Sequence, residues 1–288
     1  MGCILGGAIG DAIGGPFEGK KGPISVGVSH AWRLSDDTQL TLATMEGLAA
    51  GMPVSPARIA ERFAAWFREG RITGIGSSTL KAMRDLVAGA HWALAGAKGD
   101  RAAGNGAAMR AAPLAFVFDP HSAEDRVLLR DVCRITHHHE EAYVGALAVV
   151  LAIHAVAHAG VNDFVSAVAD ALPDSVVRDR LRAVAEMASS TSVVEVAGRI
   201  GCSGYVGESV PLALHAARCA ASEGFEAVVL GAVSAGGDTD TIAAIAGQIA
   251  GAQLGVAGIP PEMLARIPGV DSLRAQVGAF AVLVNGGR

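Results

Sequence analysis

Two short acidic segments near opposite ends of the chain carry its most chemically informative side chains. The first is Ser35-Asp36-Asp37-Thr38, and the second is Gly236-Gly237-Asp238-Thr239-Asp240-Thr241. Each precedes an apolar, alanine-rich run that is typical of a helix, so each aspartate pair is expected where a helix begins. If the two helix starts converge, unit charges ~4 Å apart repel by about 1 kcal/mol even in water. Such a cluster of carboxylates requires cations.

The donor atoms of these segments are all oxygens, which suits a hard divalent ion such as Mg²⁺ or Mn²⁺ rather than a zinc ion held by thiolates. The alternative is that both segments are ordinary helix N-caps, because Ser, Asp and Thr are preferred there. One aspartate suffices for a cap, so the doubling favours the metal site. Residues two apart in a helix point about 200° apart, so Asp238 must lie in the preceding turn to meet the same ions as Asp240. Gly236-Gly237 allows that turn, because glycine adopts positive φ readily.

The composition indicates a packed helical protein. The 288 residues are 51% hydrophobic but only 5% aromatic, and 37 are glycine. The core must therefore be built from Ala, Val, Leu and Ile with close approach of helices. The net charge of −5 and the pI near 6.0 disfavour binding to a nucleic-acid backbone.

Cysteine usage and hydropathy point to a cytoplasmic protein with no membrane partner. The four cysteines lack the spacing of a disulfide framework or a zinc site, which suits a reducing compartment. No signal peptide is evident. The most apolar segment, Tyr143 to Ala157, contains His154 and is short for a membrane span, so we expect a central buried helix.

Helical patterns cover most of the chain and predict one all-α domain over residues 1–288. A first helix of small residues should end at Gly14-Gly15-Pro16 and allow a neighbouring helix to come very close. Another carries Trp66 and Phe67 and ends at Glu69. Further helices are expected at 38–50, 77–90, 122–134, 139–159, 162–171, 175–189, 191–199, 208–222, 223–232, 240–254, 260–267 and 271–284.

Several other segments have both a structural and a functional interpretation. Gly104-Asn105-Gly106 is either a tight turn or a loop whose exposed N–H groups bind phosphate or ribose oxygens, with Met109 and Arg110 just beyond. Thr136-His137-His138-His139-Glu140 is either a solvated loop with a helix cap or a donor of hydrogen bonds to a diphosphate. Glu18 is a surface carboxylate or an acid/base group near the metals. Tyr205, between glycines, packs locally or stacks on a purine.

In order and across nearly the whole chain, these segments resemble those of the ADP-ribosylglycohydrolase family. The segments that carry the resemblance are Gly10-Asp11-Ala12 with Glu18, Ser35-Asp36-Asp37-Thr38, Gly104-Asn105-Gly106 with Met109-Arg110, Thr136-His137, and Gly236-Gly237-Asp238-Thr239-Asp240-Thr241. The resemblance, which extends to the branch that reactivates dinitrogenase reductase, implies a compact orthogonal helical bundle. It also implies two Mg²⁺ or Mn²⁺ ions and hydrolysis that removes ADP-ribose from modified side chains or related compounds.

The resemblance also implies roles for single residues. Ser35, Asp36 and Asp37 would hold one ion and Asp238 and Thr241 the other, while Asp240 would touch both. Asp37 and Asp240 would thus be catalytic, together with Glu18 as a flexible glutamate that gates the cleft and assists hydrolysis. The implied contacts with ADP-ribose come from Asn105, Gly106, Ala107 and Met109, from His137 at the diphosphate, and from Tyr205 at the adenine.

One departure from the family pattern concerns the linkage that is cleaved. The dinitrogenase reductase-activating branch has an aspartate, implicated in arginine-linked chemistry, at the loop position of Gly74. Gly76, Ser77 and Ser78 remain available to line the phosphate or proximal-ribose pocket. Two other functions stay open at this stage, a non-catalytic ADP-ribose-binding or structural protein and a two-metal phosphohydrolase that cuts the diphosphate.

Overall fold

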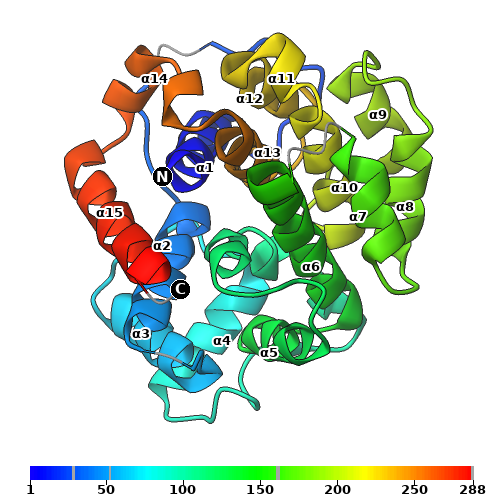
Figure 1. The fold of residues 1–288 in the computed structure, drawn as a ribbon. Helices are drawn as coiled ribbons and strands as arrows, with labels where there is room; N and C mark the ends of the chain where they lie inside the picture. Colours follow the sequence, from blue (N-terminus) through cyan, green and yellow to red (C-terminus); the bar gives the residue numbers. More distant parts are fainter. Residues whose placement is uncertain (28–29, 52, 160–162, 287–288) are drawn as a thin grey trace.

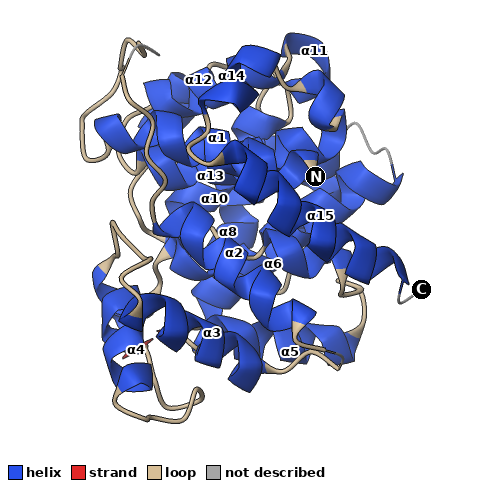
Figure 2. Cartoon of the chain, turned by 90° about the vertical axis from the view of Figure 1, so that its left-hand side faces the viewer, coloured by secondary structure: helices blue, strands red, loops and turns tan. Residues whose placement is uncertain are grey.

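Helices form nearly all of the regular structure in the computed structural model, which describes residues 1–27, 30–51, 53–159 and 163–286 (Figures 1 and 2). The α-helices are α1 Gly2–Gly14, α2 Asp36–Ala49, α3 Pro56–Arg68, α4 Ser77–Val87, α5 Ala123–Arg134, α6 Glu140–His154, α7 Phe164–Ala171, α8 Val176–Ala185, α9 Val193–Ile200, α10 Val206–Ala217, α11 Ala220–Glu223, α12 Phe225–Ser234, α13 Thr239–Leu254, α14 Pro261–Arg266 and α15 Val270–Gly286. Two-residue strands, β1 Ala97–Lys98 and β2 His137–His138, pair in parallel. The predicted all-α class is confirmed.

Helices α1 and α13 pack antiparallel at the centre of the molecule (Figure 1). A glycine stripe makes the contact possible. A Cβ built at Gly6 would lie 2.3 Å from the carbonyl oxygen of Gly247, and one at Gly10 would lie 2.0 Å from that of Ala243. The close approach predicted for the first helix is therefore present. It places the end of α1 beside the start of α13, since a Cβ at Gly14 would lie 2.5 Å from Cα of Asp240.

We expect Gly10→Ala to lower the free energy of unfolding by about 3 kcal/mol, because the added methyl group meets backbone that cannot move aside cheaply. Gly198→Ala, inside α9, is the matched control. No other described residue beyond its chain neighbours and its own helix has an atom within 4 Å of a Cβ at Gly198, so this substitution should change stability by no more than about 1 kcal/mol. Urea unfolding of the two variants checks the difference. Equal stabilities would contradict the close-packed interface.

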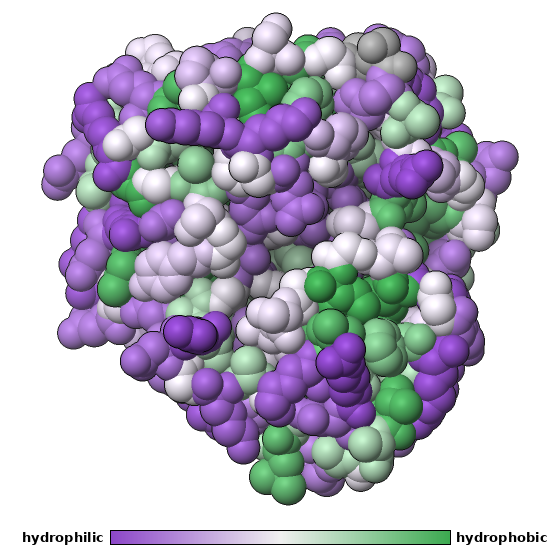
Figure 3. All heavy atoms as spheres, turned by 180° about the vertical axis from the view of Figure 1, so that it is seen from behind, coloured by the Kyte–Doolittle hydropathy of each residue, from purple (hydrophilic) through white to green (hydrophobic). Residues whose placement is uncertain are grey.

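One continuous cluster of buried hydrophobic side chains runs from Cys3 in α1 to Phe280 in α15. Helix α6 lies within it, with residues 142–153 buried, as predicted for the apolar segment. Among the described residues, Glu140–Ala157 is apolar and long enough to cross a membrane, but 72% of this window is buried inside the protein. On the face seen in Figure 3, hydrophilic side chains predominate and hydrophobic ones form small groups.

Some predicted helix limits are wrong. The expected helix over 208–222 is two helices, α10 and α11, of which α10 begins at Val206 and contains Pro211. Gly224, with φ of 84°, ends α11, and α12 begins only at Phe225. The α-helix expected over 139–159 changes into a π-turn after His154. The predicted start of the 162–171 helix lies outside the described residues, and α7 is seen from Phe164.

Candidate active site

The two acidic segments meet at one cavity of about 510 Å³. The turn after α1, the first turns of α2, α4 and α13, and the loops at 104–109 and 203–204 all contribute to its wall. The residues that line it are Glu18, Gly19, Asp36, Asp37, Gly74, Gly76, Ser77, Ser78, Thr79, Arg101, Gly104, Asn105, Gly106, Met109, His137, Ser203, Gly204, Gly237, Asp238, Asp240 and Thr241. Its volume lies in the range of small-molecule sites in proteins.

Asp11, on α1, fixes the start of α2. Its carboxylate accepts hydrogen bonds from the backbone N–H groups of Ser35 (3.0 Å) and Thr38 (3.2 Å). It also accepts from the hydroxyl of Ser35 at 2.7 Å and from that of Thr38 at 2.5 Å. Ser35 is in addition the N-cap of α2, with its Oγ accepting from the N–H of Asp37. Asp36 and Asp37 are thereby held in the first helical turn.

The glycine pair before α13 forms the predicted turn. Gly236 and Gly237 have φ values of 78° and 77°. This turn docks on the segment after α1, since the N–H of Gly19 donates to the carbonyl of Gly237 and the N–H of Gly237 donates to that of Lys20, both at 2.8 Å. A Cβ at Gly237 would lie 2.0 Å from the carbonyl oxygen of Cys202. The two glycines thus bring Asp238 against the turn that carries Glu18.

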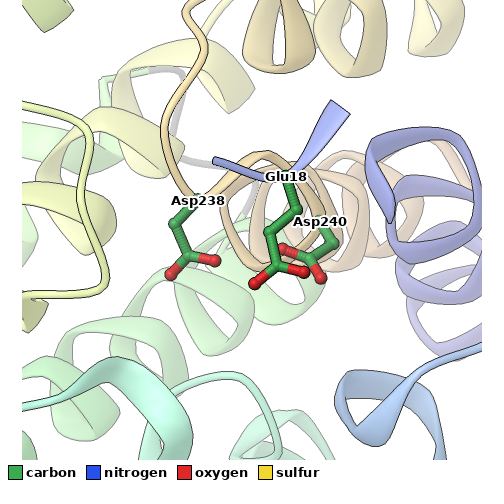
Figure 4. Close-up of side chains that lie close together, drawn as sticks. All are labelled: Glu18, Asp238 and Asp240. Atoms are coloured by element: carbon green, nitrogen blue, oxygen red, sulfur yellow. The ribbon is translucent and has the colours of Figure 1, made fainter. Parts of the chain in front are cut away.

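The carboxylates converge. The hydroxyl of Thr241 donates to Oδ2 of Asp37 at 3.3 Å, which links the starts of α13 and α2. Carboxylate oxygens of Glu18, Asp238 and Asp240 all lie within 4.8 Å of one another (Figure 4). Glu18 is exposed and Asp240 is buried, so the group extends from the surface into the protein. The expected meeting of two acidic helix starts is therefore observed.

Burial and mutual repulsion raise the pKa values of these carboxyl groups. Burial, followed by the charges of neighbouring aspartates, raises the pKa of Asp36 to about 8 and that of Asp240 to about 9. The same causes raise the pKa of Asp37 well above its usual range. For Glu18, burial and then Asp238 raise the pKa. The charged forms are therefore unfavourable in this cavity without a cation.

These residues fit divalent cations. Oδ1 of Asp37 is buried and has no hydrogen-bond partner among the described residues, although the side chains of Ser35 and Thr38 beside it are hydrogen-bonded. Helix capping explains Ser35, whose Oγ accepts a backbone N–H of α2. It does not explain Oδ1 of Asp37, because a capping oxygen would accept such a hydrogen bond and this one accepts none from the described residues. The acidic side chains that line the cavity, together with Thr241, offer carboxylate and hydroxyl oxygens, the ligands that Mg²⁺ and Mn²⁺ prefer. Bound cations would partner the unpaired oxygen and offset the repulsion.

Most residues predicted to contact the substrate line the same cavity. Gly76, Ser77 and Ser78 lie at the start of α4, whose first N–H groups can bind an anion. Gly106, Met109 and His137 line the wall beside them.

Four predicted residues lie elsewhere or make a different contact. Ser35 is not among the described residues that line the cavity, and its hydroxyl lies within hydrogen-bond distance of Oδ1 of Asp11 and Oδ2 of Asp37. Ala107 and Tyr205 are not among the described residues that line the cavity, and the ring of Tyr205 lies 5.5 Å from the guanidinium carbon of Arg180. Asn105 lines it, but its amide nitrogen donates to Oδ2 of Asp238 at 2.6 Å and to the hydroxyl of Ser209 at 3.1 Å. Asn105 therefore holds a predicted metal ligand in place. The proposed contacts of Tyr205 and Ala107 with ADP-ribose stay predictions.

Several residues of the site were not predicted as site residues, among them Asp11, Thr79 and Arg101. Asp11 organises α2, Thr79 lies in the cavity wall, and Arg101 is the basic residue among the described lining. The sequence placed Asp11 in the segment Gly10-Asp11-Ala12, which carries the family resemblance, but assigned it no role, and Arg101 stands in a Gly- and Ala-rich loop with no distinguishing signal. Only the fold shows which of these residues reach the cavity.

The fold and the site together define an all-helical protein with an acidic cavity, and the chain belongs to the ADP-ribosylglycohydrolase family, whose model matches residues 1–287. An uncharacterized Archaeoglobus fulgidus protein is 33% identical over 87% of this chain and 86% of its own length. Danio rerio ADP-ribosylhydrolase ARH3 is 29% identical over 94% of this chain and 86% of its own length. Rhodospirillum rubrum ADP-ribosyl-[dinitrogen reductase] glycohydrolase is 27% identical over 93% of this chain and 89% of its own length.

A solved structure confirms the fold relationship. It is described as an ADP-ribosylglycohydrolase-related protein complex and aligns with a TM-score of 0.70 at 26% sequence identity, over 97% of this chain and 95% of its own. The relationship therefore spans the whole helical unit, including both acidic segments.

Proposed function

We propose that this protein is a metal-dependent hydrolase that removes ADP-ribose from modified protein side chains or related conjugates by cleaving an N- or O-glycosidic bond. The observation that carries the proposal is the convergence of five carboxylates, from Glu18, Asp36, Asp37, Asp238 and Asp240, at one cavity in a member of this family. The names of the Danio rerio and Rhodospirillum rubrum relatives, both hydrolases of ADP-ribose linkages, support the reaction class.

Two divalent cations would be held by Ser35, Asp36 and Asp37 on one side and Asp238 and Thr241 on the other, with Asp240 shared. When bound, they would orient the ribose hydroxyls and lower the pKa of a water molecule. The protein itself contributes position. The α2 start is fixed by Asp11, and Asp238 is fixed by Asn105, so the ligands are preorganised before a substrate enters.

The remaining cavity residues would bind the rest of the substrate. The start of α4 at Ser77 offers backbone N–H groups to phosphate oxygens, and Arg101 adds a positive charge at the wall. Glu18, on the turn after α1, lies near enough to Asp238 and Asp240 to exchange a proton with a water molecule or leaving group held there. Its raised pKa suits that task, because a general acid or base works best with a pKa near the operating pH.

The backbone conformation at Gly74 helps to decide which ADP-ribose linkage the protein would cleave. Gly74 has φ of 77°, and a Cβ there would lie 3.3 Å from Cβ of Ser35 and 3.6 Å from Oδ1 of Asp36. The chain thus has no side chain at the position of the aspartate implicated in arginine-linked chemistry, and any side chain there would be strained. We therefore include serine-linked and acetylated ADP-ribose beside arginine-linked ADP-ribose among the candidate substrates.

The test is a panel of these three substrates, each assayed with Mg²⁺, with Mn²⁺ and with a chelator, followed by product analysis. Release of free ADP-ribose from at least one substrate, only when metal is present, would support the proposal. AMP and ribose phosphate as products would instead indicate a phosphohydrolase. Metal-dependent binding of ADP-ribose in calorimetry without turnover of any substrate would indicate a binding protein.

The metal-free protein should lose stability as the pH rises. Because Asp36 and Asp240 have folded-state pKa values of about 8 and about 9, against about 3.9 in an unfolded chain, the folded state binds more protons between these values. Its free energy of unfolding therefore falls between about pH 4 and pH 9. Saturating Mg²⁺ should offset this loss, so the gain in melting temperature over a chelator sample should be larger at pH 8.5 than at pH 6. Equal gains would contradict a cation at these carboxylates.

A further inference from the structure

Arg110 is a buried cation with no carboxylate partner among the described residues. Its side chain is 1% exposed, and its Nη2 donates to the carbonyl of Val132 at 3.2 Å and to Oγ1 of Thr136 at 2.8 Å. The guanidinium carbon lies 4.9 Å from the centre of the Phe63 ring. Burial lowers the pKa of Arg110 to about 10, so the group is still charged at neutral pH. A buried charge is costly, and an apolar side chain would fill the same space at lower cost.

The proton count at Thr136 fixes the direction of the next hydrogen bond. Arginine has no acceptor, so Oγ1 of Thr136 must accept from Arg110. The same oxygen lies 2.8 Å from Nδ1 of His137, and no other acceptor within the described chain bonds to it. Thr136 is fully buried, so its hydroxyl hydrogen has no water to reach. The hydroxyl therefore donates to Nδ1, and the ring proton of His137 must sit on Nε2.

The Nε2 edge of His137 faces the cavity. Cβ atoms built at Gly104 and Gly106 would lie 3.2 Å and 3.3 Å from Nε2, and one at Gly106 would lie 2.7 Å from Cε1, so both glycines leave room for this edge. No described residue makes a hydrogen bond to Nε2, and the ring lines the cavity wall. Burial, together with the charge of Arg110, lowers the pKa of His137 to about 3, so the ring is neutral.

We propose that Arg110 and Thr136 are positioning residues that lock His137 in the neutral Nε2–H tautomer, which donates one hydrogen bond to an oxygen of the bound ligand. A phosphate oxygen is an acceptor only, so a fixed donor recognises it whatever the pH of the medium near neutrality. In this form Nε2 has no free electron pair, so His137 is neither a base nor a metal ligand there. The ligand's identity as ADP-ribose rests on the proposed function, but the tautomer does not.

The tautomer is measured by long-range ¹H–¹⁵N correlation on the ligand-free, Mg²⁺-loaded protein with ¹⁵N-labelled histidine, with the His137 signals assigned from a His137→Gln variant. We expect Nδ1 to give the signal of an unprotonated nitrogen and Nε2 that of a protonated one. Thr136→Val, which replaces the hydroxyl with a methyl group, should give a mixture of tautomers, and Thr136→Ser should restore the wild-type spectrum. A wild-type spectrum with the proton on Nδ1, or an unchanged spectrum in Thr136→Val, would overturn the proposal.

Binding measurements add a second readout. Thr136→Val should raise the Kd for ADP-ribose about twofold, because an equal mixture of tautomers leaves about half of the protein able to donate this hydrogen bond. The Kd for Mg²⁺ should stay unchanged, which a general loss of structure would not allow. Thr44→Val is the control, since Thr44 is equally buried and, within the described part of the chain, its hydroxyl bonds only to the carbonyl of Leu40 in α2. The spectrum is recorded without ligand, so it decides the tautomer whether or not ADP-ribose binds. Failure of the wild-type protein to bind ADP-ribose would therefore overturn the proposed function but not the tautomer.

Discussion

Asp240→Asn should abolish turnover of an ADP-ribosylated substrate and weaken Mg²⁺ binding together. The carboxylate is buried, lies within 4.8 Å of ligand oxygens of both Glu18 and Asp238, and stands at the first turn of α13 facing α2. Asparagine keeps the shape and can still accept the N–H of Thr241, but it supplies no negative charge to a shared cation. We expect kcat/KM to fall by at least about 10³-fold, the scale of losing a principal electrostatic contact in an active site.

The same substitution should stabilise the metal-free protein at pH 8. Neighbouring carboxylates and burial oppose the charged form of Asp240, so a neutral amide removes that penalty. Thermal unfolding in a chelator would thus show a higher melting temperature, which excludes misfolding as the cause of lost activity. Glu226→Gln, an exposed carboxylate in α12, is the matched control and should change neither activity nor Mg²⁺ affinity. Full turnover by Asp240→Asn would reject the metal site.

Features that depend on local sequence were predictable. The glycine and alanine spacing of the first helix predicted close packing, and α1 meets α13 along this stripe. The doubled aspartates predicted two acidic helix starts, and Gly236-Gly237 predicted the positive-φ turn before α13. In each case the residue types act through backbone conformation or helix periodicity, which a single segment already specifies.

Features that depend on long-range contacts were not predictable in the same way. Asn105 looked like part of a turn or a phosphate cradle, but the fold places its amide on Asp238, 133 residues further along the chain. Asp11 belongs to a segment that carries the family resemblance, but its role in fixing the start of α2 is seen only once α2 packs against α1. Some helix limits were predicted wrongly for a related reason. Pro211 lies inside α10 and Gly224 separates α11 from α12, and whether such a residue interrupts a helix depends on the tertiary packing around it.

Glu18→Gln should remove most of the turnover while leaving the metals bound. Glu18 lies on an exposed turn outside helices α2 and α13, and its pKa is raised by burial and by Asp238, as suits a group that exchanges protons. Loss of a general acid or base lowers kcat by about 10²- to 10⁴-fold. We expect that loss with KM and Mg²⁺ affinity changed only a few-fold, measured by steady-state kinetics and calorimetry.

The pattern across the two variants separates the roles of the clustered carboxylates. Asp240→Asn should lose Mg²⁺ affinity and turnover together, whereas Glu18→Gln should lose turnover alone. A wild-type kcat/KM that rises through the pKa of Glu18 should also lose this limb of its pH profile in Glu18→Gln, because glutamine does not titrate. If Glu18→Gln instead lost Mg²⁺ affinity as strongly as Asp240→Asn, Glu18 would be a metal ligand, as its distance from Asp238 and Asp240 also permits. The gating and proton-transfer role would then have to pass to another group that lines the cavity.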